Sequence, residues 1–487
     1  MTDRVGGLGT HPGESNAGGS LVITNGRLAE GGPAVDVATR AGRVVGIHPH
    51  RGGVSTADPG DETLDAAGGV ILPGLHDHHV HLRAAAAALA SVQAGPPAVR
   101  DRDGLARALD RPGSGWIRAV GYHESVAGPL DRDVLDQLAP GRPVRVQHRS
   151  GAMWILNSAG LAALGADLPH HAGLERDGED RPTGRLFRMD DWLAGRIHPA
   201  PIDLTEVGAR AARSGVTGFT EAGPEPSPAT IQWLADQRAS GHLAQRLVVM
   251  APTDGAGPGW EGGSLAWGPA KFLLDDDSLP ALEELAHRFR RVHQDGRPVA
   301  VHCVTRAQLF LTLAALSDAG PTAGDRIEHG SVIPEEAVAT IGRLGLAVVT
   351  NPGFVLQRGE EYQSDVEPGD QPHLYRARSL IDAGVRVAAG TDAPFGPADP
   401  WTAMRAAIER HSAEGRPVGP GEAVEERTAL GWFLSDPMDL RRERRVEVGG
   451  PADLFILGCS LPEAVSAGGG AGVTGTVIGG RIAHCEL

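Results

Sequence analysis

The sequence feature that most constrains this chain is a histidine-rich run, HDHHVH at residues 76–81. The run directly follows an apolar segment, residues 70–75, that is typical of a buried strand. Side chains in a strand alternate between its two faces, so we expect His79 and His81 to point the same way, together with Asp77. Buried imidazoles are costly to desolvate unless their lone pairs are used, and a divalent metal is the obvious user. The alternative is a solvated histidine-rich turn, and the apolar segment before the run argues against it.

The bulk properties limit the partners of the chain. At 487 residues it is too long for one ordinary core, which favours one large domain with a smaller one. A net charge of −16 disfavours nucleic acid and anionic membranes as partners. The chain holds no stretch of about 18 apolar residues, so we expect no membrane span. A small-molecule substrate is the expected partner, and the oligomeric state stays open, with a homo-oligomer among the options.

Two further features concern the start of the chain and its cysteines. Residues 1–20 are polar and glycine-rich without an apolar core, which predicts a flexible tail and no secretory signal. Cys303, Cys459 and Cys485 are too few and too scattered for a disulfide framework. We therefore expect a cytoplasmic protein.

Lys271 is the only lysine among 45 basic residues. A coding bias towards arginine explains the general pattern, but it raises the question of what an ammonium group does here that a guanidinium group cannot. A buried lysine can lose its proton, and its free amine can then react. Neither property is open to arginine.

Both ends of the chain have the pattern of short β-strands. Alternating segments and turns occur between residues 21 and 47, and again between residues 452 and 483. Neither end has enough strands to be stable alone. We therefore expect residues 21–72 and 440–487 to combine into one small β-sandwich.

From residue 204 onward, strands alternate with helices. The expected strands cover residues 216–220, 247–250, 270–274, 298–302, 326–329, 347–350 and 385–390. Alternation of this kind implies parallel strands with right-handed crossovers. With the histidine strand and one strand from an irregular insertion at about 95–200, the units number about eight, as a closed (β/α)8 barrel over residues 73–439 requires. An open doubly wound sheet is the alternative, but no glycine-rich dinucleotide fingerprint follows the first strand.

Polar residues recur at the carboxyl ends of the expected barrel strands. They are His79, His81, Lys271, His302, His329 and Asp392. In a (β/α)8 barrel these strand ends converge on one mouth, where active sites lie. Each residue alone is as well explained by a structural role. Together they predict one metal-binding rim.

Several motifs resemble the amidohydrolase superfamily of metal-dependent hydrolases, in particular its branch containing N-substituted formamide deformylases. They are PGLHDHHVH at residues 73–81, WILNS at 154–158, RIEHG at 326–330, GTDAP at 390–394 and GPADL at 450–454. The resemblance thus spans nearly the whole chain. It implies a distorted (β/α)8 barrel, an α/β fold, beside a small β-sandwich built from both termini.

The resemblance also implies a ligand set. His79 and His81 would hold one metal, and His302 and His329 the other. Lys271 would bridge the two metals as a carbamate formed with CO2, and Asp392 would contact the first metal and transfer protons. The donor set favours two zinc ions, with manganese, iron or cobalt as alternatives. The metals would activate a water to hydroxide and polarise the scissile carbonyl, while Asp392 carries the proton to the leaving amine.

Other residues are candidates for substrate binding. They are His123, His148, Trp154, Glu221 and Tyr375. Most of them fall in the irregular insertion or in a long loop expected at residues 352–377, and loops of that length are often lids or binding elements. Ser150-Gly151-Ala152 replaces the Asp-Gly-His common in relatives, which bears on substrate specificity and not on the proposed metal ligands.

The sequence therefore predicts a metal-dependent hydrolase that cleaves a non-peptide C–N bond, in an amide, N-acyl or N-formyl group, by metal-activated hydroxide. Two alternatives remain open. The same metal centre could serve a deaminase or an ester or lactone hydrolase. The chain could also be a non-catalytic metal-binding partner protein, against which the complete ligand set argues.

Overall fold

The computed structural model describes residues 20–52, 57–58, 60–96, 98–113, 115–165, 168–197, 202–254 and 265–486. The predicted flexible tail, residues 1–20, lies outside the described residues except for Ser20. The chain divides into two compact units. The first comprises Met1–His81, Leu204–Asp392 and Gly396–Leu487, and the second comprises Leu82–Asp203 with Ala393–Phe395.

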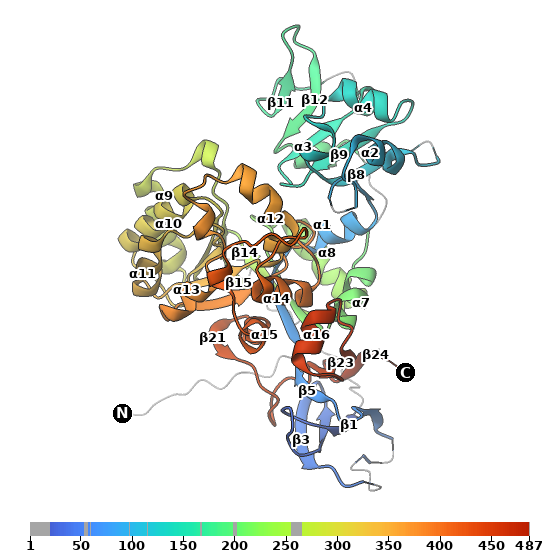
Figure 1. Ribbon diagram of the computed structural model, residues 1–487, viewed down its shortest axis with the longest axis vertical. Helices are drawn as coiled ribbons and strands as arrows, with labels where there is room; N and C mark the ends of the chain where they lie inside the picture. The colour runs from blue at the N-terminus through green and yellow to red at the C-terminus, as the bar shows by residue number, and fades with distance from the viewer. Residues whose placement is uncertain are drawn as a thin grey trace. The chain divides into compact units, whose positions relative to one another are not determined.

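The first unit contains a nearly closed barrel of eight parallel strands within the described part of the chain (Figure 1). The strands are β6 (Leu75–Val80), β13 (Val216–Glu221), β14 (Arg246–Ala251), β15 (Leu265–Phe272), β16 (Val299–Cys303), β17 (Arg326–His329), β18 (Ala347–Thr350) and β19 (Arg386–Ala389). Just after β19, the backbone N–H of Asp392 donates to the carbonyl oxygen of His79, near the end of β6, at 2.8 Å. The predicted barrel is confirmed. The expectation that the insertion supplies one barrel strand is wrong, because β6 and the regular part of the chain provide all eight.

Helices alternate with most of the barrel strands. The helices between two barrel strands include α7 (Thr205–Arg213), α8 (Pro228–Ala239), α9 (Leu282–Gln294), α10 (Arg306–Ala319), α11 (Glu335–Arg343) and α13 (Ala377–Asp382). Two more, α14 (Pro400–Glu409) and α15 (Glu426–Leu434), follow the last barrel strand. Local signals set their starts. Thr305 and Gln308 form a capping box at α10, and Asp399 caps α14. The cap of α10 lies just after the end of β16, so it helps to fix the rim of the barrel there.

The segment expected to be a long loop, residues 352–377, is largely helical. It contains α12 (Gly353–Asp365) and the short 3-10 helix η2 (Gln371–His373). Pro352 and Gly353 indicate a turn by composition, but proline is also favoured at the start of a helix. Val355 and Gly359, four residues apart, are both buried, and this packing outweighs the low helix propensity of glycine.

Strands from both termini form the two small sheets expected from the sequence. One sheet has the order β3-β2-β1-β4 and the other β24-β23-β22-β5. The strands are β1 (Leu21–Gly26), β2 (Val35–Arg40), β3 (Arg43–Pro49), β4 (Glu62–Asp65), β5 (Val70–Pro73), β22 (Leu454–Leu457), β23 (Val473–Ile478) and β24 (Arg481–Cys485). They share one apolar core, in which Ile23 and Val37 meet Ile456 and Val477. Neither terminus could bury this surface alone, which explains why they combine.

The second unit has its own six-stranded sheet among the described residues, in the order β11-β12-β10-β9-β8-β7. The strands are β7 (Val92–Gln93), β8 (Ile117–Tyr122), β9 (Val144–His148), β10 (Met153–Leu156), β11 (Leu174–Arg176) and β12 (Pro182–Phe187). The helices are α1 (Leu82–Leu89), α2 (Arg102–Leu109), α3 (Glu124–Ala127), α4 (Arg132–Leu138), α5 (Ser158–Ala163) and α6 (Asp190–Ala194). The region is therefore not irregular. Its strands are short and mix parallel with antiparallel pairing, which leaves no regular strand-helix alternation in the sequence.

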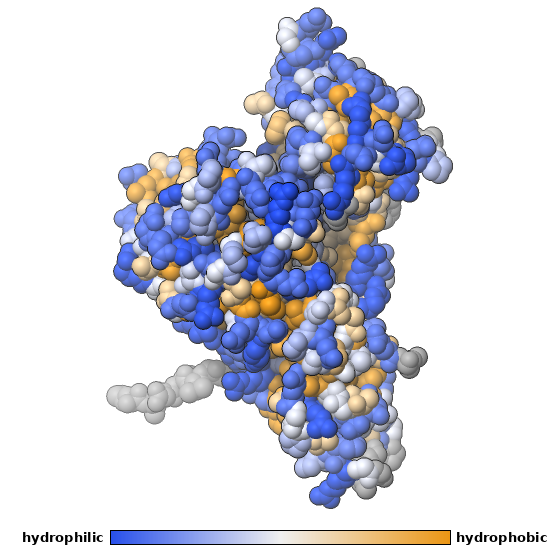
Figure 2. Space-filling view, in the orientation of Figure 1, coloured by the Kyte–Doolittle hydropathy of each residue, from blue (hydrophilic) through white to orange (hydrophobic). Residues whose placement is uncertain are grey.

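The surface in view is mostly hydrophilic, with apolar side chains between the polar ones (Figure 2). Exposed apolar residues include Val45, Met438 and Val448. Among the described residues, no helix is both long enough and apolar enough to cross a membrane.

Candidate metal centre

Residues 76–80 of the histidine run form the end of β6 and are buried, and His81, the next residue, is partly exposed. His79 is 1% exposed, and its ring lies 5.5 Å from that of His81, measured between centroids. The two rings lie close together with their planes at 67° to each other. Asp77 accepts hydrogen bonds from the backbone N–H and the hydroxyl of Thr391, and from the backbone N–H of His79. Burial raises the pKa of Asp77 to about 6.

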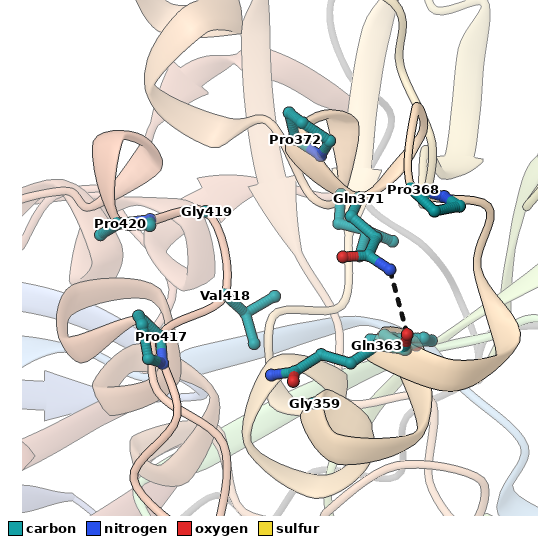
Figure 3. A pocket seen from close by; sticks show the side chains of 11 residues that line it. Gly359, Gln363, Pro368, Gln371, Pro372, Pro417, Val418, Gly419 and Pro420 are labelled. Atoms are coloured by element: carbon teal, nitrogen blue, oxygen red, sulfur yellow. Dashed lines mark hydrogen bonds between the residues drawn. The ribbon is translucent and has the colours of Figure 1, made fainter.

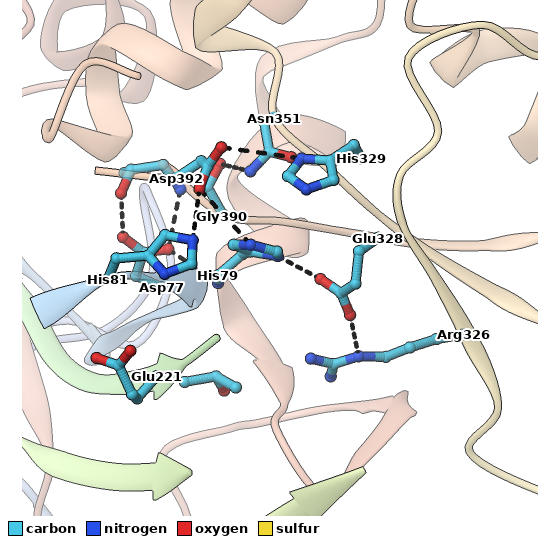
Figure 4. A network of polar contacts seen from close by, with 12 residues as sticks. Asp77, His79, His81, Glu221, Arg326, Glu328, His329, Asn351, Gly390 and Asp392 are labelled. Atoms are coloured by element: carbon cyan, nitrogen blue, oxygen red, sulfur yellow. Dashed lines mark hydrogen bonds and ion pairs between the residues drawn. The ribbon is translucent and has the colours of Figure 1, made fainter. Parts of the chain in front are cut away.

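One ring nitrogen of His79 is hydrogen-bonded, and the other is not. Its Nδ1 is hydrogen-bonded to Glu328 (Figure 4). Its Nε2 makes no hydrogen bond to any described residue and lies 3.6 Å from Oδ1 of Asp392. Burial, followed by the charge of Lys271, lowers the pKa of His79 well below its usual value. His79 is therefore a neutral imidazole with a buried nitrogen available to a ligand.

His329, at the end of β17, is held in a similar way. Its Nδ1 lies 2.8 Å from Oδ1 of Asn351, whose amide donates to the carbonyl oxygen of Gly390 at 2.9 Å. Its ring lies 4.6 Å from that of His79 and 4.6 Å from that of His302. Burial lowers the pKa of His329 well below the usual value as well.

Asp392 connects these histidines. One carboxylate oxygen, Oδ1, lies 3.2 Å from Nε2 of His81, and the other lies 3.9 Å from Nδ1 of His329. Both Asp392 and His329 have left-handed backbone conformations, with φ of 55° and 67°. Such conformations are uncommon for these residue types and cluster at functional sites.

His79, His329 and Asp392 form a group that could hold a metal ion. One ligand atom from each residue lies within 4.8 Å of the other two, and all three residues are buried. The remaining predicted ligands adjoin this group. His81 contacts Asp392, and the ring of His302 lies against that of His329.

Lys271 lies on β15 and is 3% exposed. Its Nζ is buried and makes no hydrogen bond within the described part of the chain. Burial lowers the pKa of this amine, while the charges of Glu328 and Asp392 act in the opposite direction. A buried amine without a partner is costly, and it is the group that a carbamate-bridged metal pair requires.

These residues fit a divalent metal. The imidazoles of His79 and His329 are neutral, as ligands must be, and the His79 nitrogen facing the centre has no protein partner among the described residues. Mixed nitrogen and oxygen donors suit zinc and its first-row neighbours.

Two of the predicted substrate-binding residues belong to the first unit. Glu221 ends β13, is 8% exposed, and accepts a hydrogen bond from the backbone N–H of Gly223 at 3.1 Å. Tyr375 is 3% exposed, and its hydroxyl accepts from Ser331 at 3.2 Å and lies 2.8 Å from the hydroxyl of Tyr362. Burial raises the pKa of Tyr375 well above its usual value, so its hydroxyl stays protonated.

The other three predicted residues belong to the second unit. His123 follows β8 and His148 ends β9, with Nε2 atoms 3.9 Å and 3.1 Å from the same oxygen of Glu124. Trp154, on β10, is 4% exposed, and its indole N–H donates to Asp190 at 2.8 Å.

A cavity of about 320 Å3 lies elsewhere in the first unit (Figure 3). It is lined by parts of α12 and η2 and by residues 417–420. In Figure 3 the Gln371 side chain points towards Gln363, and its amide donates to the carbonyl oxygen of that residue at 3.1 Å. None of the predicted metal ligands lines this cavity.

Sequence reasoning missed two partners of the histidines, Glu328 and Asn351. Glu328 lies inside the quoted motif RIEHG, and Asn351 follows β18. Their position could have identified them as candidates, because both lie at the carboxyl end of a barrel strand.

Comparisons with known proteins agree with this centre. A family model described as the amidohydrolase family matches residues 62–484. An N-substituted formamide deformylase of Arthrobacter pascens is 25% identical over 473 residues, covering 82% of this chain and 85% of the relative. A putative amidohydrolase of Bacillus subtilis (strain 168), YtcJ, is 24% identical over 404 residues, covering 73% and 76%.

A solved structure shows the same fold. The crystal structure of an uncharacterized metal-dependent hydrolase from Pyrococcus horikoshii OT3 superimposes with a TM-score of 0.68. It is 17% identical, and the match covers 91% of this chain and 98% of that one.

Proposed function

We propose a reaction for this protein starting from its family: the chain belongs to the amidohydrolase family, and it is a metal-dependent hydrolase with a buried His/His/Asp metal site. The reaction is hydrolysis of a non-peptide C–N bond in an N-formyl or N-acyl amide. The activity printed for the Arthrobacter pascens relative, which is 25% identical, makes an N-substituted formamide the first substrate to test.

The observation that carries this proposal is the buried amine of Lys271 beside neutral histidines. Its Nζ makes no hydrogen bond to the described residues, and its pKa is lowered by burial. A neutral amine can add CO2 and release one proton, which leaves a carbamate with two oxygen donors. This carbamate would bridge two metals, one held by His79 and His81 and the other by His302 and His329. A lysine serving only as a counter-ion would instead need hydrogen-bonded carboxylates.

Two zinc ions suit the donor set, with manganese, iron or cobalt as alternatives. When bound, divalent metals supply Lewis acidity that lowers the pKa of water and polarises a carbonyl.

Asp392 is the proposed proton carrier. It would accept the proton of the attacking water and deliver it to the leaving nitrogen, so that the amine departs neutral. Its backbone N–H is tied to His79, which fixes the main chain while the carboxylate exchanges the proton.

Five residues are proposed to bind the substrate. Glu221 and Tyr375 would do so in the first unit, and His123, His148 and Trp154 in the second. The protonated Tyr375 hydroxyl and the N–H groups of the two histidines are donors suited to a carbonyl oxygen. Glu221 and His148 lie at the ends of β13 and β9, and the proposed metal centre does not use them.

The test is a metal assay combined with an activity screen over N-substituted formamides, N-acyl amides, esters, lactones and aminated heterocycles. We expect about two equivalents of metal and turnover of formamides or acyl amides. If only aminated heterocycles are turned over, the protein is a deaminase instead. If only esters or lactones are turned over, it is an ester or lactone hydrolase. Bound metal without any turnover would favour a non-catalytic protein.

The state of Lys271 has its own test. Protein equilibrated with 13C-bicarbonate should give a carbamate carbon signal, and the Lys271→Ala variant should lack it. The Arg107→Ala variant, which changes an exposed basic residue on α2, serves as the control. A wild-type spectrum without the signal would rule out the bridge.

A further inference from the structure

A fully buried ion pair lies directly beside His79. Arg326 and Glu328 are two residues apart on β17, so their side chains share one face of the strand. They are 2% and 0% exposed. Nε of Arg326 donates to Oε1 of Glu328 at 2.5 Å, and the other carboxylate oxygen, Oε2, contacts Nδ1 of His79 (Figure 4).

This arrangement determines which nitrogen of His79 carries the proton. A carboxylate can only accept hydrogen bonds. Nδ1 of His79 must therefore be the donor, and in a neutral imidazole Nε2 then holds the lone pair. That nitrogen lies 3.6 Å from Asp392 and makes no hydrogen bond to the described residues.

The same contacts show which of two roles Glu328 can have: a metal ligand, or a partner that acts on a ligand. A metal ligand needs a carboxylate oxygen directed at the ion. Both oxygens of Glu328 are engaged elsewhere, one by Arg326 and one by His79. Its geometry is therefore that of a group acting on the metal through an imidazole.

We propose that Glu328 is a positioning residue that fixes the tautomer and the ring orientation of His79 for metal binding, and that Arg326 holds Glu328 in place. The inference rests on the proposed role of His79 as a ligand. Partners of this kind orient metal-bound histidines and raise their basicity.

Glu328→Gln is a sharp test because it keeps the size of the side chain. If the amide oxygen stays with Arg326, its NH2 group faces Nδ1 of His79 and favours the wrong tautomer. If the oxygen faces His79, the NH2 group opposes the N–H of Arg326. Either orientation loses one of the two contacts.

The measurement is metal affinity of the full-length protein, obtained by zinc titration against a competing chelator. We expect about 10–100-fold weaker binding for Glu328→Gln, with the number of metals at saturation unchanged. The d–d absorption spectrum of the cobalt-loaded protein should shift as well. Glu283→Gln, an exposed change in the first turn of α9, should match the wild type in both measurements.

Each outcome decides a different point. Wild-type affinity and an unchanged cobalt spectrum in Glu328→Gln would overturn the inference, and loss of a metal equivalent at saturation would make Glu328 a ligand instead. If Glu328→Gln does not fold, Glu328→Asp keeps the charge beside Arg326 and shortens the reach, and it should weaken binding in the same direction. If His79→Ala binds metal as tightly as the wild type, the proposed function fails, independently of Glu328.

Discussion

His79 and His329 of the barrel carry their ring protons on the opposite nitrogen from His123 and His148 of the second unit. In the barrel, Nδ1 of His79 faces a carboxylate and Nδ1 of His329 faces an amide oxygen, so Nδ1 is the donor. In the second unit, backbone N–H groups donate to Nδ1 of His123 and of His148. Their Nε2 atoms therefore carry the proton and point towards Glu124.

The position of the ring proton suits two different functions of histidine. His79 and His329 present a lone pair at Nε2, which suits a metal ligand. His123 and His148 present an N–H group, which suits recognition of an oxygen acceptor. The hydrogen-bond partners also differ in how far they lie from the histidine along the sequence. Glu328 is 249 residues from His79 in the chain, whereas Ser125 and Ser150 are each two residues from their histidine.

The largest effect is expected at Asp392, where the barrel centre would perform chemistry. Asp392→Asn should keep its metal and lose about 10²–10⁴-fold in turnover, because an amide cannot carry the proton. Steady-state kinetics and metal analysis of the same sample measure both quantities. Near-normal turnover would remove the proposed role of Asp392.

The next effect directly compares the two kinds of histidine. His79→Ala should lose bound metal, whereas His148→Ala should keep the full metal content and raise KM by about 10-fold, the equivalent of one lost hydrogen bond. Elemental analysis of both purified variants, with kinetics for His148→Ala, provides the test. Metal loss in His148→Ala would show that the comparison between the units is wrong.

A pH effect should follow from the buried histidines of the barrel. Four of them have pKa values lowered well below 6.5, mainly by burial: His76, His78, His79 and His329. The unfolded chain binds these protons more readily, so the free energy of unfolding falls as the pH drops below about 6.5. Asp77, with its pKa raised to about 6, acts in the opposite direction, but it is one group against four.

Urea denaturation of chelator-treated protein at pH of about 7.5 and 5.5 measures this effect. We expect a loss on the order of 1 kcal/mol per histidine between these conditions. Equal unfolding midpoints at both pH values would contradict the burial of neutral imidazoles.

The smallest effect is expected in the core of the second unit. Trp154→Phe removes the hydrogen bond to Asp190 and should lower the free energy of unfolding by about 1 kcal/mol. Metal content should stay at the wild-type value, as measured on the same preparation. A change in metal content would contradict an effect confined to the second unit.

The sequence predicted the barrel well because its strands are buried and alternate regularly with helices. The sheet of the second unit was not predicted, since pairing between short strands of mixed direction leaves no periodic signal. The helix α12 was missed because Pro352 and Gly353 indicate a turn by composition, whereas tertiary packing decides the outcome.

The same limit applies to the metal centre. Strand-end histidines could be found one by one, because each follows an apolar run. Glu328 and Asn351 could not be assigned their roles, since their contacts depend on how the strands are arranged around the barrel. Glu328 on β17 reaches His79 on β6, although these two strands are not neighbours. Long-range pairing therefore decides what the local pattern leaves open.

The bonds from Asp392 to His79 and from Thr391 to Asp77 join residues more than 300 positions apart. A chain still emerging from the ribosome holds the first histidines long before it holds the carboxylate that completes their surroundings. Hydrolytic capacity therefore arises late in synthesis, after the last barrel strand has docked beside the first. A fragment truncated before that strand would contain the other barrel strands and would lack a complete metal centre.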